Sequence, residues 1–185
     1  MISTSLAKLF NCGSYIHATK EYRIIMEYYG KDYNSMDNDD ITFHKILELT
    51  DLEYAINCTN SRPDLHLIWR EYALWCTSLI ENHISDKVFL NSFYSAKLFV
   101  QGIIDSEQLE AAYQKAYKFM RSNSSDLEWA ANSCALNVSH KHFDTAIYNC
   151  FLNSGFTLLT FGIEEKELDD MQFKKFLEIT MYDDR

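Results

Sequence analysis

Proline and glycine are scarce in this sequence, since 185 residues contain one proline and five glycines. An average protein has roughly 12% of the two combined. The chain therefore has few positions suited to sharp turns or to backbone with positive φ. Sandwiches and barrels need many such turns, so the composition disfavours hairpin-rich β folds and favours long helices.

Basic residues are fewer than acidic ones. The sequence has 17 Lys and Arg residues and 27 Asp and Glu residues, which gives a net charge of −10 with neutral histidines. An acidic surface repels phosphate backbones, and no run of basic residues offsets it. We therefore expect no direct nucleic-acid binding. A protein with a basic surface is the partner that this charge favours, and the oligomeric state stays open.

Long apolar runs are missing as well. No stretch approaches the ~20 apolar residues of a membrane span, and the first residues lack the pattern of a secretion signal. The five cysteines are odd in number, widely spaced and without a Cys-x-x-Cys pair, so neither a zinc site nor a disulfide framework is indicated. These features predict a cytoplasmic protein without membrane contact.

Recognisable catalytic motifs are absent too. The sequence has no nucleophile elbow, phosphate-binding loop or dinucleotide-binding turn, so we assign no catalytic, cofactor-binding or metal-binding residue and expect no cofactor. His140 and His142 form the one clustered histidine pair, but on a helix their side chains point about 200° apart. A metal-dependent hydrolase that uses these two histidines remains an alternative.

Apolar residues at three- and four-residue steps predict helices along most of the chain. The apolar run 156–163 is read either as a short strand or as a buried helix turn. We therefore predict an all-α protein, a single-domain bundle of about seven to nine helices over residues 1–185. The expected helical ranges are 6–30, 41–49 with a cap at Asp39 or Asp40, 63–83, 86–101, 106–120, 129–155 as one bent or two helices, and 168–181.

A repeated phrase marks two helix starts. The sequence from Thr50 to Ala55 returns in similar form from Ser125 to Ala130, 75 positions later. Each copy matches a capping box, in which the hydroxyl of Thr50 or Ser125 caps a helix and a glutamate three residues on reaches back. Tyr54 and Trp129 would then begin buried stripes. An internal duplication and two independent helix starts both remain open.

The central part of the chain carries Ala, Trp and Cys in a recurring arrangement on the predicted helices. The segments are Asp51–Cys58, Trp69–Cys76, Phe93–Gly102, Ser106–Ala112, Trp129–Cys134 and Ala146–Cys150, with Cys12 and Gly13 near the start. This arrangement resembles the all-helical immunity-protein family five of bacterial polymorphic toxin systems. The resemblance spans residues 5 to 155 and implies a protein that binds and neutralises a toxin without catalysis.

Two acidic clusters are the candidate partner-binding residues, because carboxylates would steer the chain toward a basic toxin surface. They are Asp37, Asp39 and Asp40 in the first cluster, and Glu164, Glu165, Glu167, Asp169 and Asp170 in the second. The alternative to partner binding is that each of these carboxylates is only a solvated surface group. One alternative binding function is that of a phage or mobile-element protein that mimics nucleic acid and inhibits a host defence complex. A self-assembling helical scaffold is another alternative.

Overall fold

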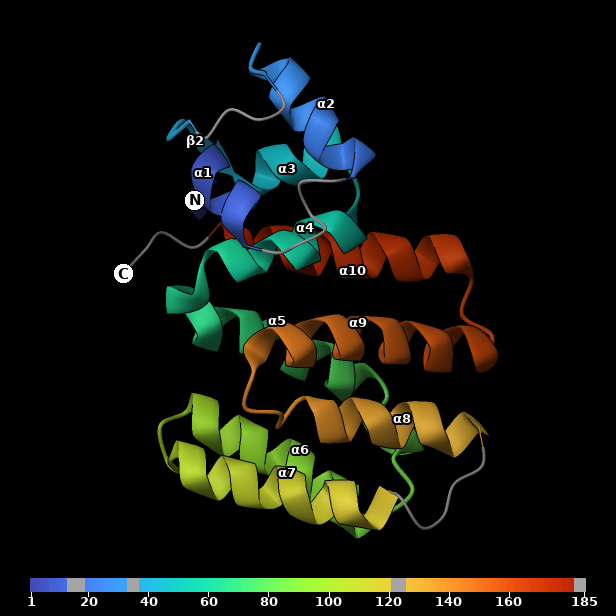
Figure 1. The fold of residues 1–185 in the computed structure, drawn as a ribbon. Helices are drawn as coiled ribbons and strands as arrows, with labels where there is room; N and C mark the ends of the chain where they lie inside the picture. Colours follow the sequence, from blue (N-terminus) through green and yellow to red (C-terminus); the bar gives the residue numbers. More distant parts are fainter. Residues whose placement is uncertain (13–18, 33–36, 121–125, 182–185) are drawn as a thin grey trace. The chain divides into compact units, whose positions relative to one another are not determined.

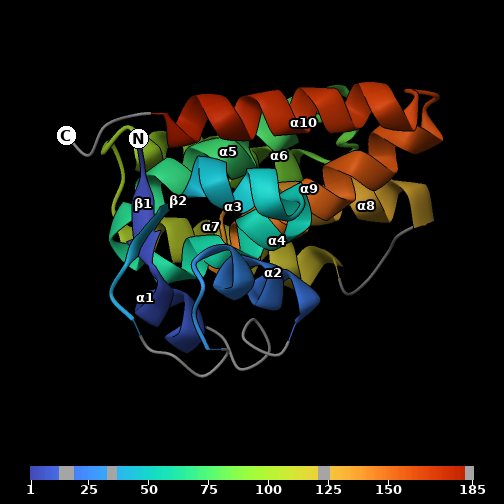
Figure 2. The ribbon, with the colours of Figure 1, turned by 90° about the horizontal axis from the view of Figure 1, so that it is seen from above.

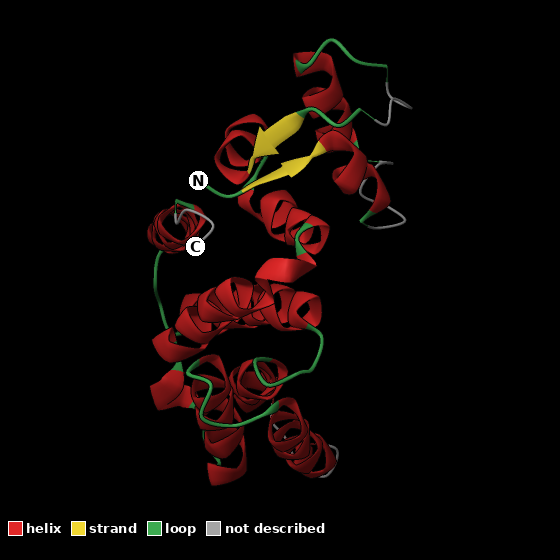
Figure 3. Ribbon diagram, turned by 90° about the vertical axis from the view of Figure 1, so that its left-hand side faces the viewer, coloured by secondary structure: helices red, strands yellow, loops and turns green. Residues whose placement is uncertain are grey.

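The computed structural model describes residues 1–12, 19–32, 37–120 and 126–181, with the backbone alone for residues 126 and 127. Within these ranges the chain forms ten α-helices and one two-stranded sheet (Figure 3). The all-α prediction is confirmed, although the helix count is slightly higher than expected. None of the described helices combines the length and apolarity needed to cross a bilayer.

The chain divides into two compact units. The first unit comprises Met1–Leu65 and Phe173–Arg185, and the second comprises His66–Gln172. The prediction of one domain over residues 1–185 stays a prediction, since one domain can contain two compact units. The last helix, α10 (Glu165–Thr180), supplies residues to both units.

The first unit combines short helices with the small sheet (Figure 2). Strand β1 pairs antiparallel with β2, and Thr4 lies opposite Ile41. Besides the end of α10, its elements are β1 (Ser3–Ser5), α1 (Leu6–Asn11), α2 (Lys20–Tyr28), β2 (Asp40–Thr42), α3 (Phe43–Leu49) and α4 (Leu52–Cys58).

Segments from both ends of the chain meet in the first unit. The amide of Ile2 donates to the carbonyl of Thr180 at 2.9 Å, and the amide of Phe43 donates to the carbonyl of Ile2 at 3.1 Å. The buried rings of Phe43 and Phe176 meet edge to face with centroids 6.4 Å apart. Backbone pairing and aromatic packing thus fix the start of the chain between α3 and α10.

Three helix starts differ from the predictions. Thr42 caps α3 in place of Asp39 or Asp40, because residues 40–42 form a strand. Asp51 caps α4 by accepting from the amide of Tyr54 at 2.8 Å, whereas Thr50 belongs to the end of α3. The predicted helix 6–30 is divided, with α1 ending at Asn11 and α2 beginning at Lys20. The second predicted cap, Ser125, lies outside the described residues.

The second unit is built from longer helices. Figures 1 and 2 both place α8 beside α9, and the loop at residues 138–142 joins the two helices as antiparallel neighbours. Besides the first part of α10, the helices are α5 (His66–Leu79), α6 (Lys87–Val100), α7 (Ser106–Met120), α8 (Asp126–Asn137) and α9 (Phe143–Thr160). The predicted helix 63–83 is shorter, because residues 63–65 and 81–83 are single 3₁₀ turns.

Small buried residues let α8 approach α9 closely. The Cys134 thiol donates to the carbonyl of Cys150 at 3.6 Å, and the Cys150 thiol donates to the carbonyl of Cys134 at 3.4 Å. Residues 156–160 continue α9, so the strand alternative for 156–163 is wrong and the helical one is confirmed up to Thr160. Gly162, with φ of 92°, then turns the chain toward α10.

Candidate functional site

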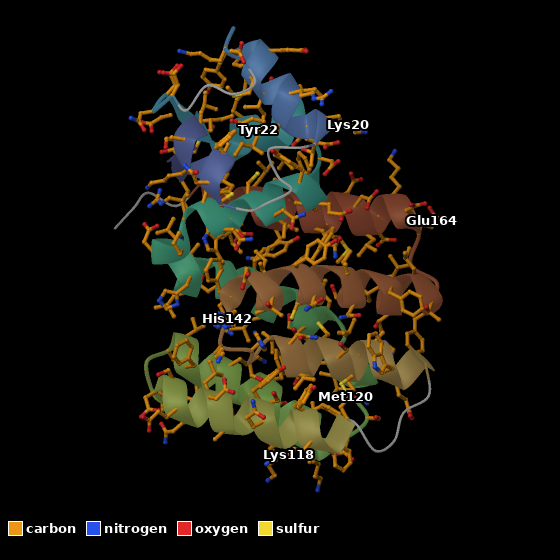
Figure 4. All side chains as sticks on the ribbon, in the orientation of Figure 1. Lys20, Tyr22, Lys118, Met120, His142 and Glu164 are labelled. Atoms are coloured by element: carbon orange, nitrogen blue, oxygen red, sulfur yellow. The ribbon has the colours of Figure 1, made fainter. Side chains whose placement is uncertain are left out.

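The second acidic cluster occupies the α9–α10 turn and the first turns of α10, all within the second unit. Figure 4 labels Glu164 at the start of this helix. All five carboxylates are exposed, and none is in an ion pair with any part of the chain that the structure describes. Lys166 is the one basic residue between positions 164 and 170. Their charge stabilises the positive end of α10, and no basic side chain in the described ranges forms an ion pair with it.

Gln172 and Leu168 fix this part of α10 against α9. The side-chain amide of Gln172 donates to the carbonyl of Phe151 at 3.3 Å, and the backbone carbonyl of Gln172 accepts from the Tyr72 hydroxyl at 3.4 Å. Leu168 packs against Gly155, where an added Cβ would lie 3.4 Å from Cδ2 of the leucine. The buried contacts of Leu168 and Gln172 therefore fix the position of the acidic cluster relative to α9.

These contacts also set the register of the antiparallel pair α9 and α10. Gly155 lies level with Leu168, and Phe151 lies level with Gln172. The same pairing places Phe156 level with Glu167, and Leu159 level with Glu164. The carboxylates therefore run alongside the last two turns of α9.

An exposed apolar stripe follows the outward side of those turns. Leu152, Phe156 and Leu159 are 41%, 55% and 43% exposed, and their spacing of four and three residues places them on one helix face. On α8, Trp129 is 48% exposed. It does not begin a buried stripe, so that prediction is wrong, whereas Tyr54 is buried as predicted.

The contacts between α8 and α9 place Trp129 at the level of Phe156. The side-chain amide of Asn153 donates to the Ser133 hydroxyl at 3.4 Å, and one helical turn from each residue along the antiparallel pair leads to Trp129 and Phe156. We call Trp129, Leu152, Phe156 and Leu159 the α8–α9 apolar surface. The sequence analysis did not predict this surface, because apolar residues occupy more than one face of α9 and their spacing does not show which face is exposed.

The first acidic cluster lies in the first unit, where its residues form ion pairs and hydrogen bonds with other parts of that unit. Lys31 Nζ pairs with Asp37 at 2.8 Å and with Asp39 at 3.0 Å, and these hydrogen bonds raise the pKa of the Lys31 ammonium. The carbonyl of Asp39 accepts from the amide of Leu6, and that of Asp40 accepts from the Tyr29 hydroxyl. These three aspartates therefore position β2, and two of them share an ion pair with Lys31.

The histidine pair closes the connection between α8 and α9. Nδ1 of His140 accepts from the amide of His142 at 3.3 Å, and the ring of Tyr113 meets the His140 ring edge to face. Burial lowers the pKa of His140. Figure 4 labels His142 next to the start of α9. In the ranges that the structure describes, no group of three or more His, Cys, Asp or Glu residues could hold a metal ion.

Four of the five cysteines have a pKa that argues against an activated nucleophile. Burial raises the pKa of Cys58, Cys76 and Cys150 above the ordinary thiol value, and it raises the pKa of half-buried Cys12 to about 11. A nucleophilic cysteine needs a lowered pKa. A depression of about 460 Å³ in the first unit includes Lys8, Cys12 and Asp64, and none of the described residues that line it is a histidine.

No family model, curated protein or solved structure matches the chain. The function must therefore be argued from the surfaces themselves, and the second acidic cluster with its apolar neighbours is the strongest candidate site.

Proposed function

We propose that this chain is a non-catalytic immunity protein that neutralises a toxin in the cytoplasm by covering a basic surface of that toxin. The observation that supports this proposal best is the second acidic cluster. Its five carboxylates are exposed and form no ion pair with the described part of the chain, whereas two carboxylates of the first cluster are paired with Lys31. The five residues are Glu164, Glu165, Glu167, Asp169 and Asp170.

Electrostatics supplies the mechanism of recognition. A net charge of −10 attracts a basic protein over distances of about a Debye length, which is ~8 Å at physiological salt. The local carboxylates then orient the complex and raise its association rate. Toxins that cut nucleic acids need basic substrate sites, so a cover of this charge would block such a site by occupying it.

The proposal is tested by capturing the partner and measuring protection. The tagged chain is used to isolate proteins from its native host, and each captured protein is then expressed with and without the chain. We expect a basic protein that inhibits growth on its own and is harmless in the presence of the chain.

Two triple variants distinguish the effect of the acidic cluster on protection from the effect of the overall negative charge. Glu164→Gln, Glu165→Gln and Glu167→Gln together should abolish most of the protection. Glu27→Gln, Glu71→Gln and Glu107→Gln remove three other exposed carboxylates by the same substitution and should leave protection intact. Capture of no growth-inhibiting protein, or equal protection by both triple variants, would show that the proposal is wrong.

A further inference from the structure

We infer that the α8–α9 apolar surface is the docking site for a basic amphipathic helix of the partner protein. This inference rests on the proposed function and adds to it the segment of the partner that is bound. It is carried by the position of the exposed apolar side chains beside carboxylates that pair with no described part of the chain.

The apolar side chains of α9 and two carboxylates of α10 lie on the same side of the α9–α10 pair. Phe156 follows Gly155 by one residue, and Asp169 follows Leu168 by one residue, which is about 100° around each helix. Because α9 and α10 are antiparallel, equal rotations away from the shared contact carry both side chains toward the same side. Glu165 lies one turn before Asp169 on this side. The apolar surface is thus bordered by two carboxylates along α10.

The spacing of the apolar residues suits a helical occupant. Leu152, Phe156 and Leu159 extend over seven residues of α9, or about 10 Å, and Trp129 widens the surface toward α8. A helix that presents apolar residues at positions i, i+4 and i+7 matches this length. Exposed Phe and Trp side chains are the kind that provide most of the binding energy when a partner covers them.

Charge decides which occupant fits. A second copy of this chain would bring another charge of −10 and the same carboxylates to the contact, and like charges juxtaposed in an interface cost affinity. An anionic membrane surface would be repelled for the same reason. Lysine or arginine residues flanking the apolar face of a helix would instead pair with Glu165 and Asp169.

A synthetic peptide tests the inference directly. The probe is a labelled peptide of about 15 leucine and lysine residues, with the leucines on one helical face, and its binding to the full chain is followed by fluorescence anisotropy. A peptide of the same composition with scrambled order is the control. We expect the amphipathic peptide to bind at least about tenfold more tightly than the scrambled one.

Variants of the chain locate the contact. Phe156→Ser with Leu159→Ser should weaken peptide binding by about tenfold or more. Leu98→Ser with Ile103→Ser removes two other exposed apolar side chains of the second unit and should change binding less than about twofold. As a second measurement, the peptide should reduce acrylamide quenching of tryptophan fluorescence in the native chain and not in Trp129→Phe.

The outcomes distinguish this inference from the proposed function. Equal binding of the amphipathic and scrambled peptides, or equal binding by both double variants, overturns the docking site. Self-association of the native chain that is lost in Phe156→Ser with Leu159→Ser also overturns it in favour of a second copy. In each of these cases, protection by the chain and its loss in the Glu164, Glu165 and Glu167 variant would still support the proposed function.

Discussion

Arg70 donates a hydrogen bond from Nη2 to the carbonyl oxygen of His140 at 2.9 Å, and its Nη1 donates to the carbonyl of Val138. The side chain is 1% exposed, and Nε has no hydrogen-bond partner within the described chain. Burial lowers the pKa of the guanidinium to about 10. Arg70 therefore places a buried positive charge at the negative end of α8 and holds the connection between α8 and α9.

Replacement of Arg70 should destabilise the second unit. Arg70→Met leaves two carbonyl oxygens without their charged donor, and hydrogen bonds to charged groups contribute about 1.5–3 kcal/mol each. We expect the free energy of unfolding to fall by about 3 kcal/mol in urea titration. Lys115→Met removes a charge from the exposed side of α7 and should change it by less than about 0.5 kcal/mol. Equal stability of the two variants would contradict this role of Arg70.

Acidification should destabilise the chain through His140. Burial holds the folded-state pKa of His140 below the ordinary value of 6.5, although a hydrogen bond to the His142 backbone and the charges of Glu110 and Asp144 oppose this shift. The unfolded state then binds more protons, so this contribution to stability is complete above pH 6.5 and is lost as the pH falls through the interval between the two pKa values. In urea titrations, His140→Gln should lose less stability between pH 7 and pH 5 than the native chain does.

Exposed His66 provides the matched control for this pH dependence. His66→Gln should lose as much stability as the native chain over the same pH interval. If His140→Gln and His66→Gln show the same pH dependence, the assignment to His140 is incorrect.

The thiols should react in a defined order. Cys12 is half-buried, whereas Cys58, Cys76, Cys134 and Cys150 are buried. At about pH 7.5, a disulfide reagent should therefore modify at most one thiol of the folded chain, slowly, because the pKa of Cys12 is raised to about 11. All five should react in denaturant, and Cys12→Ser should abolish the reaction of the folded chain. Rapid reaction of two or more thiols under native conditions would contradict the described burial.

Two glycines beside the acidic cluster should respond in opposite ways to alanine. Gly155→Ala adds a Cβ at ordinary contact distance from Leu168 and improves helix propensity by up to about 1 kcal/mol, so the melting temperature should stay equal or rise. Gly162→Ala forces a side chain into backbone with φ of 92° and should cost about 1–2 kcal/mol. Thermal unfolding of both variants checks this, and destabilisation by Gly155→Ala alone would be inconsistent with the described packing.

Helix positions were predictable where apolar spacing is regular, but the choice of capping residue was not. Thr50 and Asp51 are both good caps by type. The Thr50 hydroxyl donates to the carbonyl of Ile46 at 2.7 Å, which leaves the cap to Asp51. A reciprocal capping box instead joins Asp105 and Gln108, with distances of 2.9 and 3.0 Å. The competing local hydrogen bonds that decide such cases depend on the fold.

The small sheet and the apolar surface escaped prediction for other reasons. Strands of three residues give too short an alternation to read, and β1 pairs with β2 across more than 30 residues of sequence. Helix α9 is apolar on more than one face, so periodicity alone cannot separate Phe156, which is exposed, from Cys150, which is buried. The acidic residues at 164–170 were identified from the sequence, whereas their contrast with the Lys31-paired aspartates required the structure.

The most direct test of the central claim is the association rate of the captured partner with the full chain, measured by stopped flow from about 50 mM to about 500 mM salt. If the second acidic cluster steers a basic partner, the rate should fall at least about tenfold over this range. The fall should be much smaller for the chain with Glu164→Gln, Glu165→Gln and Glu167→Gln. A rate that does not depend on salt, or the same salt dependence in native chain and variant, would contradict the account.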